Sequence, residues 1–185
     1  MPSSSSFTLA SNGGLLRVLV TKCSISQGYD HASGAPIPQL IEFDAIWDTG
    51  ATASVITQRV VDACGLQPIG MTQVQGVHGA STVETYLVNI HLPNKVGVQH
   101  VQVTKGNLGD GASVLIGMDI ITLGDFCITN KDGKTIFSFR VPSQNHVDYV
   151  KEHNAQVLRE QFTHGGSKKN RKGHDKTFGK NKNRK

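Results

Sequence analysis

Short runs rich in Val and Ile alternate with turn-forming residues along most of the chain, and this rhythm limits the folds open to it. β-branched residues favour strands, and Gly, Asn and Asp favour the tight turns between them. Seven short strands in such a rhythm are typical of a closed or sandwiched sheet, so an all-β fold is predicted. The predicted strands are Leu15–Cys23, Gln39–Trp47, Thr82–Leu92, Gly97–Val103, Ser113–Ile116, Phe126–Asn130 and Thr135–Val141.

Two helices are predicted to interrupt the strands. A short one follows Thr57 and is ended by Gly65, and a longer one covers 143–164 with Gly165 placed to end it. The apolar face of the longer helix is formed by Val147, Val150, Val157, Leu158 and Phe162. Between the last two strands, the Asp132-Gly133 pair predicts a hairpin turn, because these residues adopt the positive φ that such turns need.

Charge divides the chain into a body and an end. Residues 168–185 hold nine Lys or Arg and one acid, whereas the rest of the chain has ten basic and thirteen acidic residues. This pattern predicts a folded domain over 14–142, followed by the helix and by a disordered basic tail over 165–185. Residues 1–13 contain a Ser run and few apolar side chains, so they are also expected to be disordered.

Several classes of protein are excluded by the sequence. No run reaches the roughly 18 apolar residues of a membrane span, and no basic segment followed by an apolar one begins the chain, so a cytoplasmic protein without membrane contact is expected. Cys23, Cys64 and Cys127 contain no CxxC pair, and His146 with His153 lacks the i, i+4 spacing of a helical metal pair. The cysteines are interpreted as small buried residues, and no metal or cofactor is expected.

The stretch Phe43–Ile56 carries the clearest chemical signal. An apolar strand ends at Asp48, and Thr49 and Gly50 follow it. Gly lets the chain turn sharply while backbone N–H groups point back at the carboxylate. Ala51 and an apolar return would hold the turn under the sheet. Such a turn fixes a carboxylate in place, although an ordinary turn Asp that caps a strand end is the alternative interpretation.

This turn resembles the signature of the retropepsin-like aspartic proteases, in which apolar residues precede Asp-Thr/Ser-Gly-Ala. A second segment, Leu115-Ile116-Gly117, resembles the apolar-apolar-Gly psi-loop of that family, where a late strand passes beside the catalytic turn and leads into a short helix. The resemblance covers 15–141. Trp47 is bulkier than the aliphatic residue of the viral members, which favours a cellular, bacterial branch.

A third segment lies where that family places its flap. The tip of this Gly-bearing hairpin is formed by Gly76, Val77, His78 and Gly79. The resemblance implies that the hairpin closes over an extended peptide and donates backbone hydrogen bonds to it. His78 is interpreted either as a solvated loop residue or as a titratable group that contacts substrate.

The resemblance implies a retropepsin-like barrel and a homodimeric aspartic endopeptidase acting on protein or peptide substrates. Amide hydrolysis needs a base and an acid, and two adjacent carboxylates provide both by sharing one proton. The chain has one Asp-Thr-Gly and is too short for two lobes, so a second copy must supply the second Asp48. In the family, Thr49 would brace the paired turns across the two-fold axis, and the Gly50 N–H would hold a carboxylate oxygen.

Other interpretations stay open beside this one. Asp119 is not followed by Thr/Ser-Gly, so it is predicted to cap the turn at Ile120–Leu123 rather than to act as a second catalytic Asp. A catalytically silent dimer that binds peptides is the alternative to an enzyme. The basic residues of 168–185 are interpreted either as a solubilising tail or as one that contacts RNA or other polyanions nonspecifically. Base-specific recognition is not expected, since Phe178 is the one aromatic residue among them.

Overall fold

The computed structural model describes residues 4–34, 36–76, 79–109 and 111–165. The chain divides into two compact units, one ending at Gln144 and the other beginning at Asn145. The predictions for the basic tail beyond Gly165, and for Val77 and His78, fall outside the described residues.

The first unit is mostly β, as predicted. Within its described residues the strands are β1 Ser5–Ala10, β2 Leu19–Gln27, β3 Ile41–Trp47, β4 Val55–Ile56, β5 Gly70–Gly76, β6 Gly79–Leu92, β7 Val96–Lys105, β8 Val114–Ile116, β9 Asp125–Thr129 and β10 Ile136–Val141. The seven predicted strands are all present with shifted ends, and β1, β4 and β5 come in addition. Short 3-10 turns occur at His31–Ser33, Pro93–Lys95 and Lys131–Gly133.

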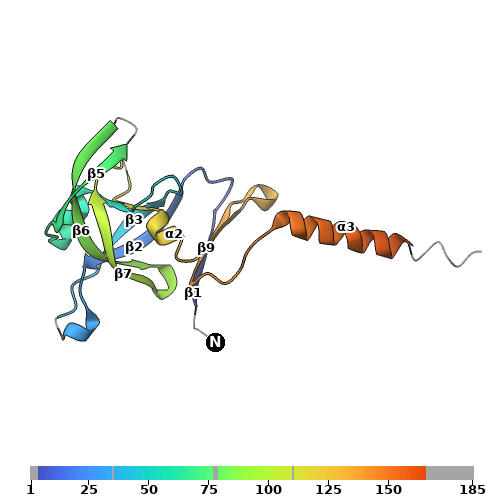
Figure 1. The fold of residues 1–185 in the computed structure, drawn as a ribbon, viewed down its shortest axis with the longest axis horizontal. Helices are drawn as coiled ribbons and strands as arrows, with labels where there is room; N and C mark the ends of the chain where they lie inside the picture. The colour runs from blue at the N-terminus through green and yellow to red at the C-terminus, as the bar shows by residue number, and fades with distance from the viewer. Residues whose placement is uncertain (1–3, 35, 77–78, 110, 166–185) are drawn as a thin grey trace, which may run out of the picture. The chain divides into compact units, whose positions relative to one another are not determined.

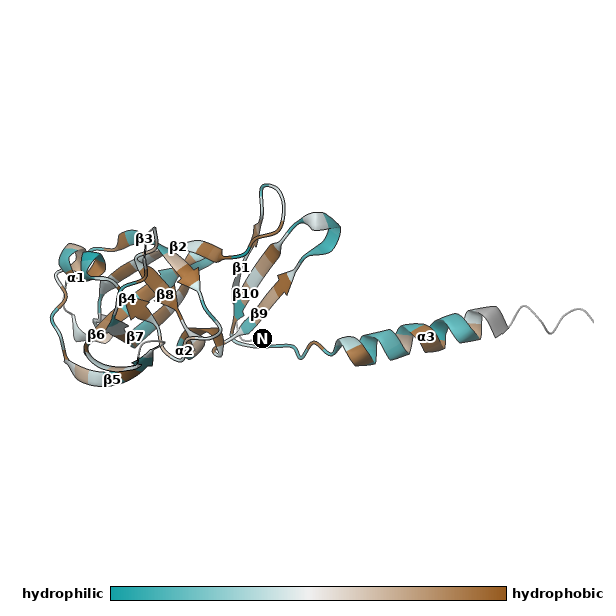
Figure 2. Cartoon of the chain, turned by 90° about the horizontal axis from the view of Figure 1, so that it is seen from above, coloured by the Kyte–Doolittle hydropathy of each residue, from teal (hydrophilic) through white to brown (hydrophobic). Residues whose placement is uncertain are grey.

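Six of the strands close into a barrel. The larger sheet has the order β2-β3-β8-β4-β7-β6-β5. Because β2 also pairs with β6, the strands from β2 to β6 in this order form a closed ring (Figure 1). Strand β5 pairs only with β6 and extends that strand as a hairpin outside the ring. Ile25, Val88, Ile90 and Ile116 point into the barrel and are completely buried. In Figure 2, hydrophobic residues are concentrated on β3, β4 and β8.

A second sheet, with the order β1-β10-β9, joins the two ends of the first unit. Strand β1 pairs antiparallel with β10 over six residue pairs, from Ser5↔Val141 to Ala10↔Ile136. The prediction that 1–13 is disordered is therefore wrong for β1. The physical reason is Phe7, which is 4% exposed and lies edge-on to Phe137 with ring centroids 5.7 Å apart. One buried aromatic ring outweighs the polar Ser run around it.

Two short helices lie between the strands. Helix α1, Gln58–Cys64, begins after Thr57 and ends at Gly65 with a left-handed φ of 61°, as predicted. Helix α2, Met118–Ile121, follows β8 directly, and its Ile120 and Ile121 are buried. The hairpin turn between β9 and β10 has positive φ at Asp132 and Gly133, 55° and 70°, which confirms the Asp-Gly prediction.

The second unit contains helix α3, Tyr149–Gly165. It begins six residues after the predicted start. Ser143 and Gln144 belong to the first unit instead. There the Ser143 hydroxyl and the Gln144 N–H donate hydrogen bonds to the Asp125 carboxylate at 2.5 and 3.0 Å. The Asp148 carboxylate accepts the Lys151 N–H at 3.0 Å and so caps the helix start. None of the described helices is both long and apolar enough to cross a membrane.

Candidate active site

Strand β8 lies between the two strands that flank the turn carrying Asp48. Strand β3 leads into the turn and β4 leads out of it, yet the two do not pair with each other. Instead β8 lies between them, parallel to β3 with Ile46 opposite Leu115, and antiparallel to β4 with Val55 opposite Leu115. The predicted psi-loop segment and the predicted catalytic turn, distant in sequence, are therefore neighbours in space.

Backbone and side-chain hydrogen bonds fix Asp48. Its N–H donates to the carbonyl of Ile116 at 3.0 Å, and its own carbonyl accepts the Ala51 N–H at 3.3 Å. The Gly50 N–H donates to Asp48 Oδ1 at 2.8 Å. A Cβ at residue 50 would lie 3.2 Å from that oxygen, so Gly allows the backbone to approach the carboxylate. The carboxylate is half-buried at the edge of the fold.

Thr49 and Gly50 form the tip of this turn, and both are exposed. Among the described residues, the Thr49 hydroxyl makes no hydrogen bond. The expected brace between Thr49 and a second copy stays a prediction. The exposed tip has room for such a partner.

Gly117 marks the point where β8 passes behind the turn. A Cβ on this residue would lie 2.7 Å from the carbonyl carbon of Ala53 and 3.0 Å from the carbonyl oxygen of Ala51. The Met118 N–H donates to that same Ala51 oxygen at 2.8 Å. Backbone therefore packs directly on backbone here, and no other residue type fits without displacing the turn.

Asp119 has a different environment from the predicted one. Its carboxylate accepts the N–H of the next residue, Ile120, at 3.0 Å, but its other hydrogen bonds come from Ser54, which follows the turn that carries Asp48. Sequence analysis missed Ser54, because a hydrogen bond between residues so far apart in sequence leaves no local pattern. The prediction that Asp119 caps the turn at Ile120–Leu123 is therefore wrong, because Asp119 lies inside α2 and Gly117 occupies the N-terminal capping position.

The predicted flap hairpin is formed by β5 and β6. Their register runs from Gly70↔Thr85 to Gly76↔Gly79, and Gly79 has a positive φ of 107°. The four residues that follow the tip, Gly79–Thr82, are exposed, whereas Thr85 and Tyr86 further along are buried in the barrel. The hairpin thus projects from the barrel (Figure 1).

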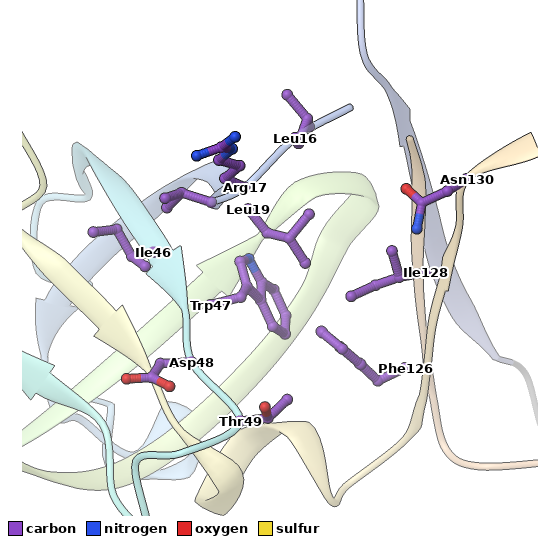
Figure 3. A pocket seen from close by; sticks show the side chains of 11 residues that line it. Leu16, Arg17, Leu19, Ile46, Trp47, Asp48, Thr49, Phe126, Ile128 and Asn130 are labelled. Atoms are coloured by element: carbon purple, nitrogen blue, oxygen red, sulfur yellow. The ribbon is translucent and has the colours of Figure 1, made fainter. Parts of the chain in front are cut away.

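A pocket of about 480 Å³ adjoins the turn that carries Asp48 (Figure 3). Its walls come from the chain before β2, from the end of β3, and from β9 of the second sheet. The Trp47 ring points into it towards Leu19 and Phe126, while the Asp48 carboxylate points the other way. The lining residues are Leu16, Arg17, Val18, Leu19, Ile46, Trp47, Asp48, Thr49, Phe126, Ile128 and Asn130. Sequence analysis named only Asp48 and Thr49 among them as site residues.

Charged pairs lie away from the turn. Lys22 on β2 contacts Asp44 at 2.8 Å, and the hydrogen bond to this carboxylate raises the pKa of the lysine. Hydrogen bonds from Lys105 and Tyr86 lower the pKa of Glu84. Among the described residues, no group of three or more His, Cys, Asp or Glu is arranged to hold a metal ion.

Comparison with protein families identifies the segment built around this turn. Residues 40–122, from β3 through α2, match the family model described as "gag-polyprotein putative aspartyl protease". These residues belong to the retropepsin-like aspartyl protease family. The matched segment contains both strands beside Asp48, the β5–β6 hairpin predicted as the flap and the β8 segment predicted as the psi-loop, and it leaves the second sheet and α3 outside.

Solved structures similar to this chain have low sequence identity to it. A retropepsin-like aspartic protease from Rickettsia conorii is 10% identical, with a TM-score of 0.45 over 75% of this chain and 96% of that one. EIAV protease in complex with an inhibitor is 18% identical, with a TM-score of 0.43 over 58% and 88%. The retroviral protease-like domain of Ddi1 from Leishmania major is 15% identical, with a TM-score of 0.40 over 71% and 100%. A search of curated proteins gives no match.

Proposed function

We propose that the chain is a homodimeric aspartic endopeptidase in which the Asp48 carboxylates of two copies activate a water molecule against a peptide bond. The observation that carries this proposal is the hydrogen bond from the Gly50 N–H to Asp48 Oδ1, in a turn whose two flanking strands both pair with β8. It holds a half-buried carboxylate in one orientation, and among the described residues no cation forms an ion pair with it. Membership of the retropepsin-like aspartyl protease family supports the same function.

The chemistry needs both carboxylates. Two carboxyl groups side by side do not both ionise cheaply, so they share one proton and titrate as a coupled pair. The ionised member takes a proton from the attacking water, and the protonated member gives one to the leaving nitrogen. One chain holds one such turn, so the catalytic unit we propose is a dimer.

Two features of the chain support the dimer and its mode of substrate binding. The Thr49 side chain is exposed beside Asp48, where a second copy would bring its own turn. The β5–β6 hairpin projects from the barrel with exposed backbone at its end, and backbone N–H and C=O groups can pair with an extended peptide. Closure of the hairpin would exclude water from the two carboxylates.

The test is cleavage of an unstructured protein between pH 4 and 8 by the full chain, with the oligomeric state measured in parallel. Asp48→Asn should lower kcat by at least ~10³-fold, because the amide cannot act as a base. Asp132→Asn is the matched control, since it removes an exposed carboxylate from the β9–β10 turn. A stable dimer without cleavage at any pH, or an equally active Asp48→Asn variant, would refute the proposal and favour a peptide-binding dimer.

A further inference from the structure

We propose that Asp119 is a positioning residue for catalysis, which holds the turn that carries Asp48 through a hydrogen-bonded contact with Ser54. The catalytic part of this inference rests on the function proposed above. It gives Asp119 a role that neither a helix cap nor a second catalytic Asp describes.

The contact uses both oxygens of the carboxylate. Asp119 Oδ2 accepts the Ser54 N–H at 2.9 Å, and Asp119 Oδ1 accepts the Ser54 hydroxyl at 2.8 Å. The Ser54 hydroxyl oxygen in turn accepts the Gly117 N–H at 3.1 Å. Ser54 is completely buried, so each of its polar groups depends on a protein partner. Two consecutive hydrogen bonds thus link the three residues: Gly117 donates to Ser54, and Ser54 donates to Asp119.

Position in the turn explains why this contact matters for Asp48. The tip residues Thr49 and Gly50 are exposed and have no neighbouring layer to hold them. The turn is therefore held at its ends. One end is tied where the Asp48 N–H meets the Ile116 carbonyl, and the other is tied where Ser54 meets Asp119. Between them, the N–H groups of Met118 and Asp119 donate to the carbonyls of Ala51 and Thr52 at 2.8 and 3.2 Å.

A carboxylate suits this position better than an amide. Its two oxygens accept three N–H or O–H groups here, two from Ser54 and one from Ile120. An ionised acceptor forms hydrogen bonds about twice as strong as a neutral one. Asn at this position would present an NH₂ group to one of those donors and lose at least one hydrogen bond.

The experiment compares Asp119→Ala and Asp119→Asn with the wild-type chain. Asp125→Asn is the matched control, because Asp125 is also a carboxylate that accepts several hydrogen bonds, but in the second sheet. Kinetics are measured on a peptide substrate at a temperature at which all variants are folded. Amide hydrogen exchange is followed at Asp48 and Met118, whose N–H groups bond backbone carbonyls rather than Asp119, and at Phe139 in β10.

In Asp119→Ala we expect kcat to fall ~10- to 100-fold with KM nearly unchanged, since small misplacement of a catalytic group has this effect. The amides of Asp48 and Met118 should exchange at least ~10-fold faster while Phe139 is unaffected. Asp119→Asn should be intermediate, and Asp125→Asn should match wild type in kcat and in exchange at Asp48 and Met118.

Three results for Asp119→Ala would overturn the inference. These are an unchanged kcat, unchanged exchange at Asp48 and Met118, or an equal increase in exchange at all three amides. If the wild-type chain cleaves no substrate, the proposed function fails on its own. The exchange pattern then decides by itself whether Asp119 holds the turn.

Discussion

The indole Nε1–H of Trp47 donates a hydrogen bond to the hydroxyl of Thr21 at 3.0 Å inside the protein. The same ring packs on Phe137 and Phe139 of β10, with ring centroids 5.1 and 5.0 Å apart. The residue directly before Asp48 is thereby anchored to the barrel on one side and to the second sheet on the other. This double anchor explains why a large aromatic residue occupies the position.

The anchor predicts that β1 is needed for stability. Phe7 is buried against Trp47, Phe137 and Phe139, so Phe7→Ala should lower the free energy of unfolding by ~3–5 kcal/mol. The neighbouring variant Thr8→Ala removes an exposed hydroxyl bonded to Ser138 at 2.8 Å and should cost about 1 kcal/mol or less. Chemical denaturation measures both. Equal small effects would mean that β1 does not pack as described.

The close approach at Gly117 predicts a sharp response to a single methyl group. Gly117→Ala would drive a Cβ to 2.7 Å from the backbone of Ala53, so it should destabilise the fold by ~1–3 kcal/mol and also reduce cleavage. Gly13→Ala is the control, because a Cβ there meets nothing within 4 Å. Thermal unfolding and activity are measured on both. A Gly117→Ala protein as stable as Gly13→Ala would show that the turn has more room than the structure gives it.

The environment of Asp125 predicts how stability depends on pH. Hydrogen bonds from the Ser143 hydroxyl, the Gln144 N–H and the Arg140 guanidinium hold the pKa of Asp125 well below its usual range. The unfolded chain has a carboxyl pKa of about 3.9, so stability from this group is complete above that pH and is lost as pH falls further towards the folded-state value. Asp125→Asn should therefore lower the melting temperature at pH 7, and its difference from wild type should shrink below about pH 4. A difference that stays constant down to pH 2 would contradict this origin.

The pocket beside Thr49 predicts where two copies meet. Ile128 lines the pocket and is 41% exposed, whereas Ile136, which is 42% exposed, lies on the opposite face of the same sheet. We expect a second copy that meets this one beside Thr49 to cover Ile128, which lines the same pocket as Thr49, rather than Ile136. Ile128→Asp should weaken dimerisation at least ~10-fold, and Ile136→Asp should leave it unchanged, as measured by analytical ultracentrifugation. Equal effects would place the subunit contact elsewhere.

Local patterns predicted the parts of the fold that local chemistry determines. The Val and Ile runs gave the barrel strands, Gly65 ended α1, and Asp132-Gly133 formed its hairpin. Strand β1 was missed because one buried side chain, Phe7, outweighs a polar run. Strand β4 is two residues long, and β5 is mostly exposed and polar, so neither shows an apolar pattern.

The candidate site was predicted in its residues but not in its supports. Asp48, Thr49, Gly50 and the psi-loop were found because their order matches a known motif. The roles of these residues stay predictions until activity is measured. Ser54 and the pocket wall were missed, since their partners are determined by the tertiary fold and not by sequence spacing.

The position of β8 between β3 and β4 has a consequence for how the protein is made. Asp48 and both strands of its turn are synthesised early, but the strand that separates them comes much later in the chain. A nascent chain that lacks Val114–Ile121 has Asp48 without the backbone partners that orient it. Pairing between such distant segments is also slow to form. Most strands of the barrel are therefore synthesised before the turn has its partners in β8. Asp48 is made well before the hydrogen bonds that orient it can form.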